Sequence, residues 1–352
     1  MFKQNVEQFD LWRSGSDGYH TYRIPALAVT RDGTILAFCE GRKHHRRDFG
    51  DIALLVKRST DGGATWSRQS IVWDDAGNTC GNPAPVVDRD SGAIHLLMTW
   101  NRGDDHERDI IAGSSHDTRR VYVTSSIDDG LTWSLPNEIT GDVKRADWTW
   151  YATGPGHGIQ IRNGKYSGRL VIPCDHIESE TKDYYSHIIY SDDNGASWNL
   201  GGRTPRPQVN ECEVVELGGG RLLLNMRSYA PGARARQVAR SADGGLTWGD
   251  QRTDPALIEP ICQASIINCP KSNGIILFAN PASASERVNM TLRGSSDEGA
   301  TWPGHVTLFG GPSAYSDLAA APDGRVLCLY EGGESHPYEF LRLAFIELDS
   351  SR

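Results

Sequence analysis

The sequence predicts an all-β protein, built as a six-bladed β-propeller of four-stranded antiparallel blades. Three observations predict this fold: the composition, a short repeat, and the spacing of that repeat. The 352 residues include 38 Gly, 17 Pro, 10 Trp and 12 Tyr, which is typical of tight turns and large buried aromatic side chains. No stretch repeats apolar residues at the helical period, so strands must supply the core.

The repeat has the form S-x-D-x-G-x-[TS]-W and follows a β-like run each time. Its five copies begin at Ser59, Ser126, Ser191, Ser241 and Ser295. Asp and Ser side chains hydrogen-bond a turn backbone, Gly supplies a positive φ, and Trp packs back as an apolar plug. Each copy is therefore predicted to close a β-hairpin. We expect a structural, non-catalytic role for its aspartate, which is Asp61, Asp128, Asp193, Asp243 or Asp297.

The spacing of the copies sets the number of blades. Successive copies begin 67, 65, 50 and 54 residues apart, with a mean of 59, so the chain holds about six units. Propellers have four to eight blades. Because the first copy begins at Ser59 and the last ends at Trp302, both termini are expected to complete the sixth blade. Residues 1–352 then form a single domain.

Charge and cysteine usage exclude several classes of protein. The net charge of −9 argues against nucleic acid as a partner, and no apolar run is long enough for membrane insertion. No signal peptide is visible, which predicts a cytoplasmic protein, or a secreted or periplasmic one whose signal has been removed. The neighbouring His44 and His45 are interpreted as part of a solvated loop, and no metal or cofactor is expected. Buried thiols are predicted for the cysteines, which are Cys39, Cys80, Cys174, Cys212, Cys262, Cys269 and Cys328.

The motif YRIPAL at Tyr22–Leu27, together with the five repeats, resembles the exo-α-sialidase (neuraminidase) family of six-bladed propellers. The likeness covers nearly the whole chain. It implies a retaining glycoside hydrolase that removes terminal α-ketosidically linked sialic acids from glycoproteins, glycolipids and oligosaccharides. It also implies a covalent tyrosyl intermediate and no cofactor.

A sialoside carries a carboxylate on its anomeric carbon, and the planar fork of arginine binds carboxylates in a bidentate manner. The resemblance implies a triad of Arg23 in YRIP, Arg227 in LLLNMRSY and Arg287 in ASERVNMTL. Arg293 competes with Arg287 and is interpreted as a strand residue that enters the fifth repeat. Glu331 in CLYEGG matches a family glutamate that orients the YRIP arginine.

The substrate carboxylate also explains the expected nucleophile, because a neutral phenol avoids the repulsion that a carboxylate would meet. The resemblance assigns the nucleophile to Tyr315 in GPSAYSDL and its base to Glu211 in NECEVVEL. Glu211 precedes Arg227 by sixteen residues, a span that suits two adjacent strands. Glu213 and Glu216 are alternatives for the base, and the N-E pair of the motif favours Glu211.

The acid/base is assigned to a loop in EGRKHHRRDFGDI. There the resemblance implies Arg42 as an auxiliary arginine and Asp48 as the acid/base, with Asp51 as the alternative. Cationic neighbours are expected to lower the pKa of Asp48, which disfavours an acid, and desolvation by bound substrate would oppose them. These neighbours are Lys43, Arg46 and Arg47.

Two stretches, Met98–Ile110 and Asp147–Ile161, are expected to form the pocket wall, although blade packing explains Trp148 and Trp150 equally well. Asn82 in GNPAPVVD lies near a position where several relatives carry a sugar-binding Asp. This difference makes a deaminated nonulosonate an alternative substrate.

Three further functions stay open at this point. Transfer to an acceptor sugar would use the same residues as hydrolysis. A silent sialic-acid-binding propeller would need the arginines but not Tyr315, Glu211 and Asp48. A scaffold, or a propeller acting on neutral glycans, would have no reason to gather three arginines.

Overall fold

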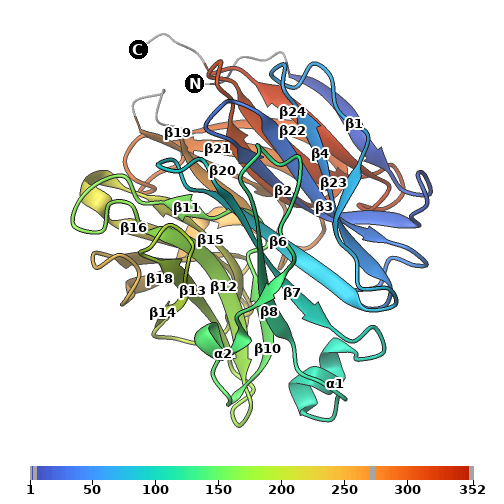
Figure 1. The fold of residues 1–352 in the computed structure, drawn as a ribbon. Coiled ribbons are helices and arrows are strands. Elements are labelled where there is room, and N and C mark those ends of the chain that lie inside the picture. Colours follow the sequence, from blue (N-terminus) through green and yellow to red (C-terminus); the bar gives the residue numbers. More distant parts are fainter. Residues whose placement is uncertain (1, 3–5, 270–273, 349–352) are drawn as a thin grey trace.

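Short antiparallel strands joined by tight turns dominate this computed structural model, which describes residues 2, 6–269 and 274–348 (Figure 1). The prediction of an all-β fold is confirmed. Helical structure in these residues is limited to α1 (Glu107–Ala112), α2 (Thr140–Val143) and the short 3₁₀ turn η1 (Gly218–Gly220). Among the residues described, no helix has the length and apolar character that crossing a bilayer requires.

The first sheet consists of two antiparallel units. The strand order is β2-β3-β4-β6-β7-β8-β9, with β5 paired to β4. A single parallel pair, Ile52 with Thr79, joins β4 to β6, and the other pairings are antiparallel. The strands are β2 (Thr21–Val29), β3 (Ile35–Arg42), β4 (Ile52–Ser59), β5 (Ser70–Trp73), β6 (Thr79–Val87), β7 (Ile94–Asn101), β8 (Arg120–Ser126) and β9 (Asn137–Glu138).

Two smaller sheets follow along the chain, and both are antiparallel meanders. One has the order β10-β12-β13-β14, with β11 paired to β12, and the other runs β15-β16-β17-β18. The strands of the first are β10 (Trp148–Thr153), β11 (Ile159–Gln160), β12 (Leu170–Glu178), β13 (Tyr184–Ser191) and β14 (Asn199–Arg203). Those of the second are β15 (Val209–Glu216), β16 (Leu222–Ser228), β17 (Ala235–Ser241) and β18 (Gly249–Ile258).

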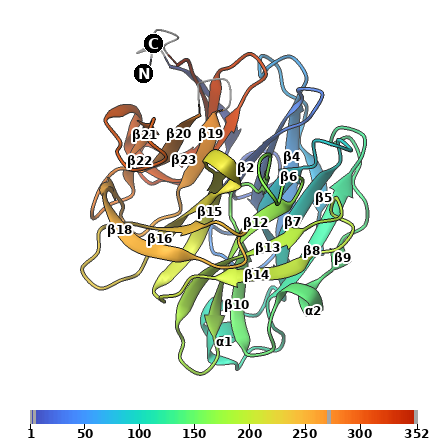
Figure 2. The same cartoon turned by 90° about the vertical axis from the view of Figure 1, so that its left-hand side faces the viewer.

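The last sheet brings the two ends of the chain together. Its order is β1-β24-β23-β22-β21-β20-β19, and β1 pairs antiparallel with β24, so blue and red strands lie side by side in Figure 1. The long strand β22 pairs with β21 over its first half and with β23 over its second. The strands are β1 (Glu7–Arg13), β19 (Ser265–Cys269), β20 (Ile275–Pro281), β21 (Val288–Ser295), β22 (Gly304–Ala320), β23 (Val326–Gly332) and β24 (Phe340–Ile346). Figure 2 shows the sheets fanning around the molecule.

The five repeats form turns that connect β4 to β5, β8 to β9, β13 to β14, β17 to β18, and β21 to β22. In the first turn, Ser59 Oγ donates to Asp61 Oδ1 over 2.8 Å and accepts from the Gly63 amide over 2.8 Å. The Thr65 amide and hydroxyl donate to Asp61 over 2.9 and 2.5 Å. The same four bonds recur in the other turns, with Ser197 replacing threonine in the third. These aspartates therefore stabilise turns, as predicted.

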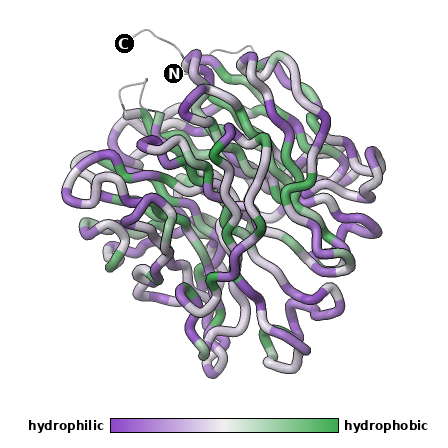
Figure 3. The backbone as a smooth tube through the Cα atoms, viewed as in Figure 1, coloured by the Kyte–Doolittle hydropathy of each residue, from purple (hydrophilic) through white to green (hydrophobic). Residues whose placement is uncertain are grey.

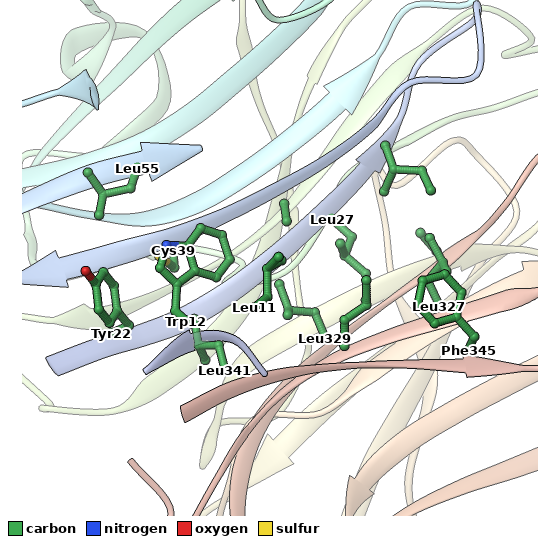
Figure 4. Packing of buried hydrophobic residues seen from close by; sticks show 14 of the residues in the cluster. Leu11, Trp12, Tyr22, Leu27, Cys39, Leu55, Leu327, Leu329, Leu341 and Phe345 are labelled. Atoms are coloured by element: carbon green, nitrogen blue, oxygen red, sulfur yellow. The ribbon is translucent and has the colours of Figure 1, made fainter. Parts of the chain in front are cut away.

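Apolar side chains fill the spaces between adjacent sheets, and the hydropathy colouring of Figure 3 places polar residues mainly on the loops. One cluster joins the two ends of the chain, because Leu11 and Trp12 of β1 pack with Leu27 of β2 and Leu327 of β23 (Figure 4). All seven cysteines are free and buried, which confirms that prediction.

Candidate active site

Five strands lose their regular pairing register next to residues that line one cavity. A β-bulge redirects side chains and interrupts the ladder locally. Pro25 and Pro83 lie within two of these bulges, where a missing amide proton is tolerated. Ile24 and Asn82 have φ values of 57° and 54°, which is a strained region for the β-branched isoleucine. The breaks lie between Arg23 and Ala26, Gly81 and Ala84, Trp148 and Tyr151, Val209 and Cys212, and Ser313 and Ser316.

The cavity has a volume of about 230 Å³ and contains eight of the nine side chains that the sequence assigned to a site. These residues come from three of the four sheets and from two loops, which carry Asp48 and Arg287. The ninth, Glu331, contacts two of them from behind. The eight lining residues are Arg23, Arg42, Asp48, Asn82, Glu211, Arg227, Arg287 and Tyr315.

The phenol of Tyr315 forms a short hydrogen bond with a carboxylate. Its Oη donates to Glu211 Oε1 over 2.5 Å, and Arg227 Nη1 donates to Glu211 Oε2 over 2.6 Å and to Tyr315 Oη over 3.2 Å. Burial and the charge of Glu211 raise the pKa of Tyr315, against the lowering effect of Arg227, Arg287 and Arg23. The phenol therefore keeps its proton in the free protein and holds it against a base.

Three arginines surround this phenol. Arg23 Cζ lies 5.0 Å and Arg287 Cζ 5.7 Å from the centre of the Tyr315 ring. Arg287 donates to the Tyr338 hydroxyl over 2.9 Å and to the Ile261 carbonyl over 3.3 Å. The geometry thus concentrates positive charge around the tyrosine.

Two buried glutamates each bind one arginine, Arg23 or Arg42, and one bulged segment of backbone. Glu331 accepts from Arg23 Nε and Nη2 over 3.0 and 3.2 Å, and from the amides of Ile24 and Tyr315. Glu40 accepts two bonds from Arg42, over 3.0 and 2.7 Å, and one from the Asn82 amide. Each carboxylate therefore fixes both a guanidinium and the bulge that carries a site residue.

Asp48 faces two of these arginines at the open side of the cavity. Its Oδ1 lies 2.7 Å from Arg42 Nη1 and 3.1 Å from Arg23 Nη1, and its side chain is 62% exposed. Burial would raise the pKa of Asp48, but Arg42 and Arg23 lower it to about 2. The expected lowering is present, but its source was predicted wrongly. Buried strand arginines supply most of it, in place of the loop cations Lys43, Arg46 and Arg47.

Comparisons with known proteins show the family of this chain. A profile of the BNR repeat-like domain matches residues 33–328. The chain is 36% identical to a sialidase of Micromonospora viridifaciens, over 96% of this chain and 54% of that protein. It is 31% identical to human sialidase-3, over 94% of this chain and 90% of that protein. The chain belongs to the sialidase family.

A solved sialidase structure shares the fold. The Hadza microbial sialidase Hz136 superimposes with a TM-score of 0.86 and 31% identity, over 96% of this chain and 67% of that chain. The present chain spans about half the length of its Micromonospora relative.

The residues that competed for these roles in the sequence do not line the cavity that contains Tyr315. Asp51 faces Lys43 and His44, at 3.7 and 3.8 Å. Glu213 is buried, where it accepts from Ser265 Oγ over 2.9 Å. Glu216 lines a separate cavity, and Arg293 donates to Asn280 Oδ1 over 3.1 Å.

The two predicted wall stretches contribute little to this cavity. Of Met98–Ile110, only Glu107 lines it, and of Asp147–Ile161, only Trp150 and Ala152. The ring of Trp148 instead stacks on the buried His176, with centroids 3.4 Å apart. Packing therefore explains Trp148, whereas Trp150 belongs to the cavity.

Sequence reasoning missed Glu40 and Arg119. Glu40 had a signal, because the E-G pair of AFCEGR also occurs in CLYEGG, the motif that contains Glu331. Arg119 is 3% exposed and donates to Asn101 Oδ1 over 2.8 Å and to the side chain of Asn82. Its guanidinium lies 4.1 Å from the Trp150 ring. No sequence motif marked it, since it precedes an ordinary strand.

Proposed function

We propose that this chain is a retaining exo-α-sialidase that removes terminal sialic acids from glycoproteins, glycolipids and oligosaccharides. The observation that carries this proposal is the 2.5 Å hydrogen bond between Tyr315 and Glu211, with three arginines around it. The proposal includes six four-stranded blades in a closed ring. The pairing of β1 with β24 and the turns at the five repeats support that arrangement.

Substrate binding places the sialic acid carboxylate among Arg23, Arg227 and Arg287. A planar guanidinium binds a carboxylate through parallel hydrogen bonds, and three guanidinium groups, from β2, β16 and the loop before β21, fix its position. Arg23 is already aimed by Glu331, so little conformational freedom is lost when the substrate binds. The anomeric carbon, which bears this carboxylate, then lies beside the phenol oxygen.

In the first step, Tyr315 Oη attacks the anomeric carbon while its proton moves to Glu211. The bond to the leaving sugar oxygen breaks, and this oxygen takes a proton from Asp48. The product is a tyrosyl–sialosyl intermediate. In the second step, Asp48 takes a proton from water, the water oxygen bonds to the anomeric carbon, and the released phenolate recovers its proton from Glu211. Two displacements return the original anomeric configuration.

The acid role requires Asp48 to carry a proton that its arginine neighbours oppose in the free protein. The substrate carboxylate neutralises part of the charge of Arg23, which is one of these neighbours. The bound sugar also removes water from an exposed side chain. Both changes raise the pKa of the Asp48 carboxyl toward that of a working acid.

Fluorescence released from a methylumbelliferyl α-sialoside tests this function. The proposal predicts turnover without added metal or cofactor, and natural sialosides should also release free sialic acid. Absence of turnover by a protein that binds free sialic acid in calorimetry would contradict the proposal. That result would favour a silent sialic-acid-binding protein.

A further inference from the structure

Lys144 directs its ammonium group into the protein behind one wall of the cavity. The residue follows α2, and its Nζ donates to Thr118 Oγ1 over 2.5 Å, to the Arg119 carbonyl over 2.7 Å and to the Thr149 carbonyl over 2.8 Å. Residues 118 and 119 lead into β8, whereas Thr149 lies in β10. One side chain therefore joins two different sheets.

The two joined segments carry the wall itself. The Arg119 carbonyl accepts a hydrogen bond from Lys144, and the Arg119 guanidinium lies 4.1 Å from the Trp150 ring. Thr149, whose carbonyl also accepts a hydrogen bond from Lys144, immediately precedes Trp150. Both Arg119 and Trp150 line the cavity. A shift at either carbonyl would therefore displace a side chain that faces the sugar.

Regular strand pairing does not hold these two carbonyls. Arg119 lies just before β8, and its neighbour Arg120 is the first residue in the β7–β8 ladder. Thr149 lies in the break between Trp148 and Tyr151, where β10 and β12 lose their register. Thr118 Oγ1 also donates to the Thr149 carbonyl, over 3.5 Å. The ammonium thus adds hydrogen bonds at the start of one strand ladder and at the register break of another.

The surroundings make this ammonium sensitive to pH. Burial is the main cause, followed by the nearby Arg119, and together they lower the pKa of Lys144 to about 7. Arg120 acts in the same direction, Asp117 opposes it, and these two residues form an ion pair at 2.8 Å. Loss of the proton leaves a neutral amine with two N–H groups, so it can donate at most two of these three hydrogen bonds, and those are no longer charge-assisted.

We propose that Lys144 is a positioning residue, whose ammonium holds the Arg119–Trp150 wall in the geometry that binds the sugar. The proposal rests on the proposed function for the identity of the ligand. Lys144 does not touch the reacting atoms. Its loss should therefore weaken binding and leave the chemical steps nearly unchanged.

Kinetics of Lys144→Met test this proposal. At about pH 6, where the wild-type lysine is charged, KM should rise about fivefold while kcat changes less than about twofold. At about pH 8.5 the wild-type ammonium has lost its proton, so the KM ratio of variant to wild type should fall toward one. Lys144→Gln should behave like Lys144→Met. An unchanged KM at low pH, or a KM ratio that is independent of pH, would overturn the proposal.

Hydrogen exchange tests, independently of catalysis, whether the three hydrogen bonds of Lys144 (the clamp) stabilise the two backbone segments that they join. In Lys144→Met, peptides spanning 118–121 and 148–151 should exchange faster than in the wild type at about pH 6, and unchanged exchange there would overturn the clamp. Lys57→Met is the matched control, because Lys57 is also half-buried, donates to the Leu11 carbonyl over 2.6 Å, and lies outside the cavity lining. It should lower stability without changing KM. If the wild type hydrolyses no sialoside, the proposed function fails, whereas these exchange rates still decide the clamp.

Discussion

The repeat turns and the candidate site both depend on carboxylates, but they differ in how far apart the partners lie along the chain. In each turn, one aspartate binds groups within four residues of itself. In the site, Glu211 binds Arg227 sixteen residues away, and Glu331 binds Arg23 across 308 residues. A turn therefore forms from its own eight residues, whereas the site exists only after the sheets have assembled.

One aspartate from each region, Asp61 in a turn and Asp48 in the site, has a lowered pKa, but the causes of the lowering differ. Asp61 has a pKa of about 2 because the Thr65 hydroxyl and amide donate to it, and Ser59 adds a third bond. Asp48 has a pKa of about 2 because two arginines outweigh its burial. Ligands do not alter the bonds within a turn, but an anionic ligand weakens the field of the arginines. Of these two carboxylates, only Asp48 can gain a proton when the substrate binds.

Tyr315→Phe should produce the largest loss of activity. It should affect the site without affecting the repeat turns. Removal of the phenol oxygen eliminates the proposed nucleophile, so kcat on natural sialosides should fall by at least about 10⁴-fold. The turns are untouched, so the melting temperature should change little. Calorimetry and sialic acid release measure the two quantities. Near-wild-type turnover would contradict the assignment.

Asp48→Asn should affect substrates according to their leaving groups. A natural sialoside needs protonation of its leaving oxygen, so its rate should fall about 10²- to 10³-fold. An activated aryl sialoside needs little protonation and should lose about tenfold or less. Parallel assays on the two substrates measure the difference. Equal losses would move the acid role away from Asp48.

Glu331→Gln should weaken binding more than chemistry. The amide cannot balance the charge of the buried Arg23, so kcat/KM should fall about 50-fold, mainly through KM. Steady-state kinetics on one sialoside measure this division. Glu331 also accepts a hydrogen bond from the Tyr315 backbone amide. A loss confined to kcat would show that Glu331 acts through Tyr315 instead of through Arg23.

Asp193→Ala, in the third turn, should have the smallest effect on activity and a clear effect on stability. The change removes bonds to Ser191 and Ser197, and the melting temperature should fall by about 2–4 °C. Turnover at low temperature should stay within about twofold of the wild type. A selective loss of rate would mean that the turns act on the site.

Sequence reasoning identified the turn bonds and the residues that share one cavity where the determinants are local or carried by a motif. The turn repeat encodes its own hydrogen bonds, and short motifs marked Arg23, Tyr315 and Glu211. It failed for Arg119, which is defined only by contacts with Asn82, Asn101 and Trp150 on other strands. It also missed the bulges, because a register break depends on the partner strand as much as on the strand itself.

Covalent trapping tests the central claim most directly. When the nucleophile attacks the anomeric carbon of a difluorosialic acid, the fluoride on that carbon should leave. A fluorosialosyl group that hydrolyses slowly should then stay bound to the protein. Intact-mass and peptide mass spectrometry should then find one label, on the peptide that contains Tyr315, and none on Tyr315→Phe. A label on Glu211 or Asp48, or turnover of the reagent without any tyrosine adduct, would contradict the account.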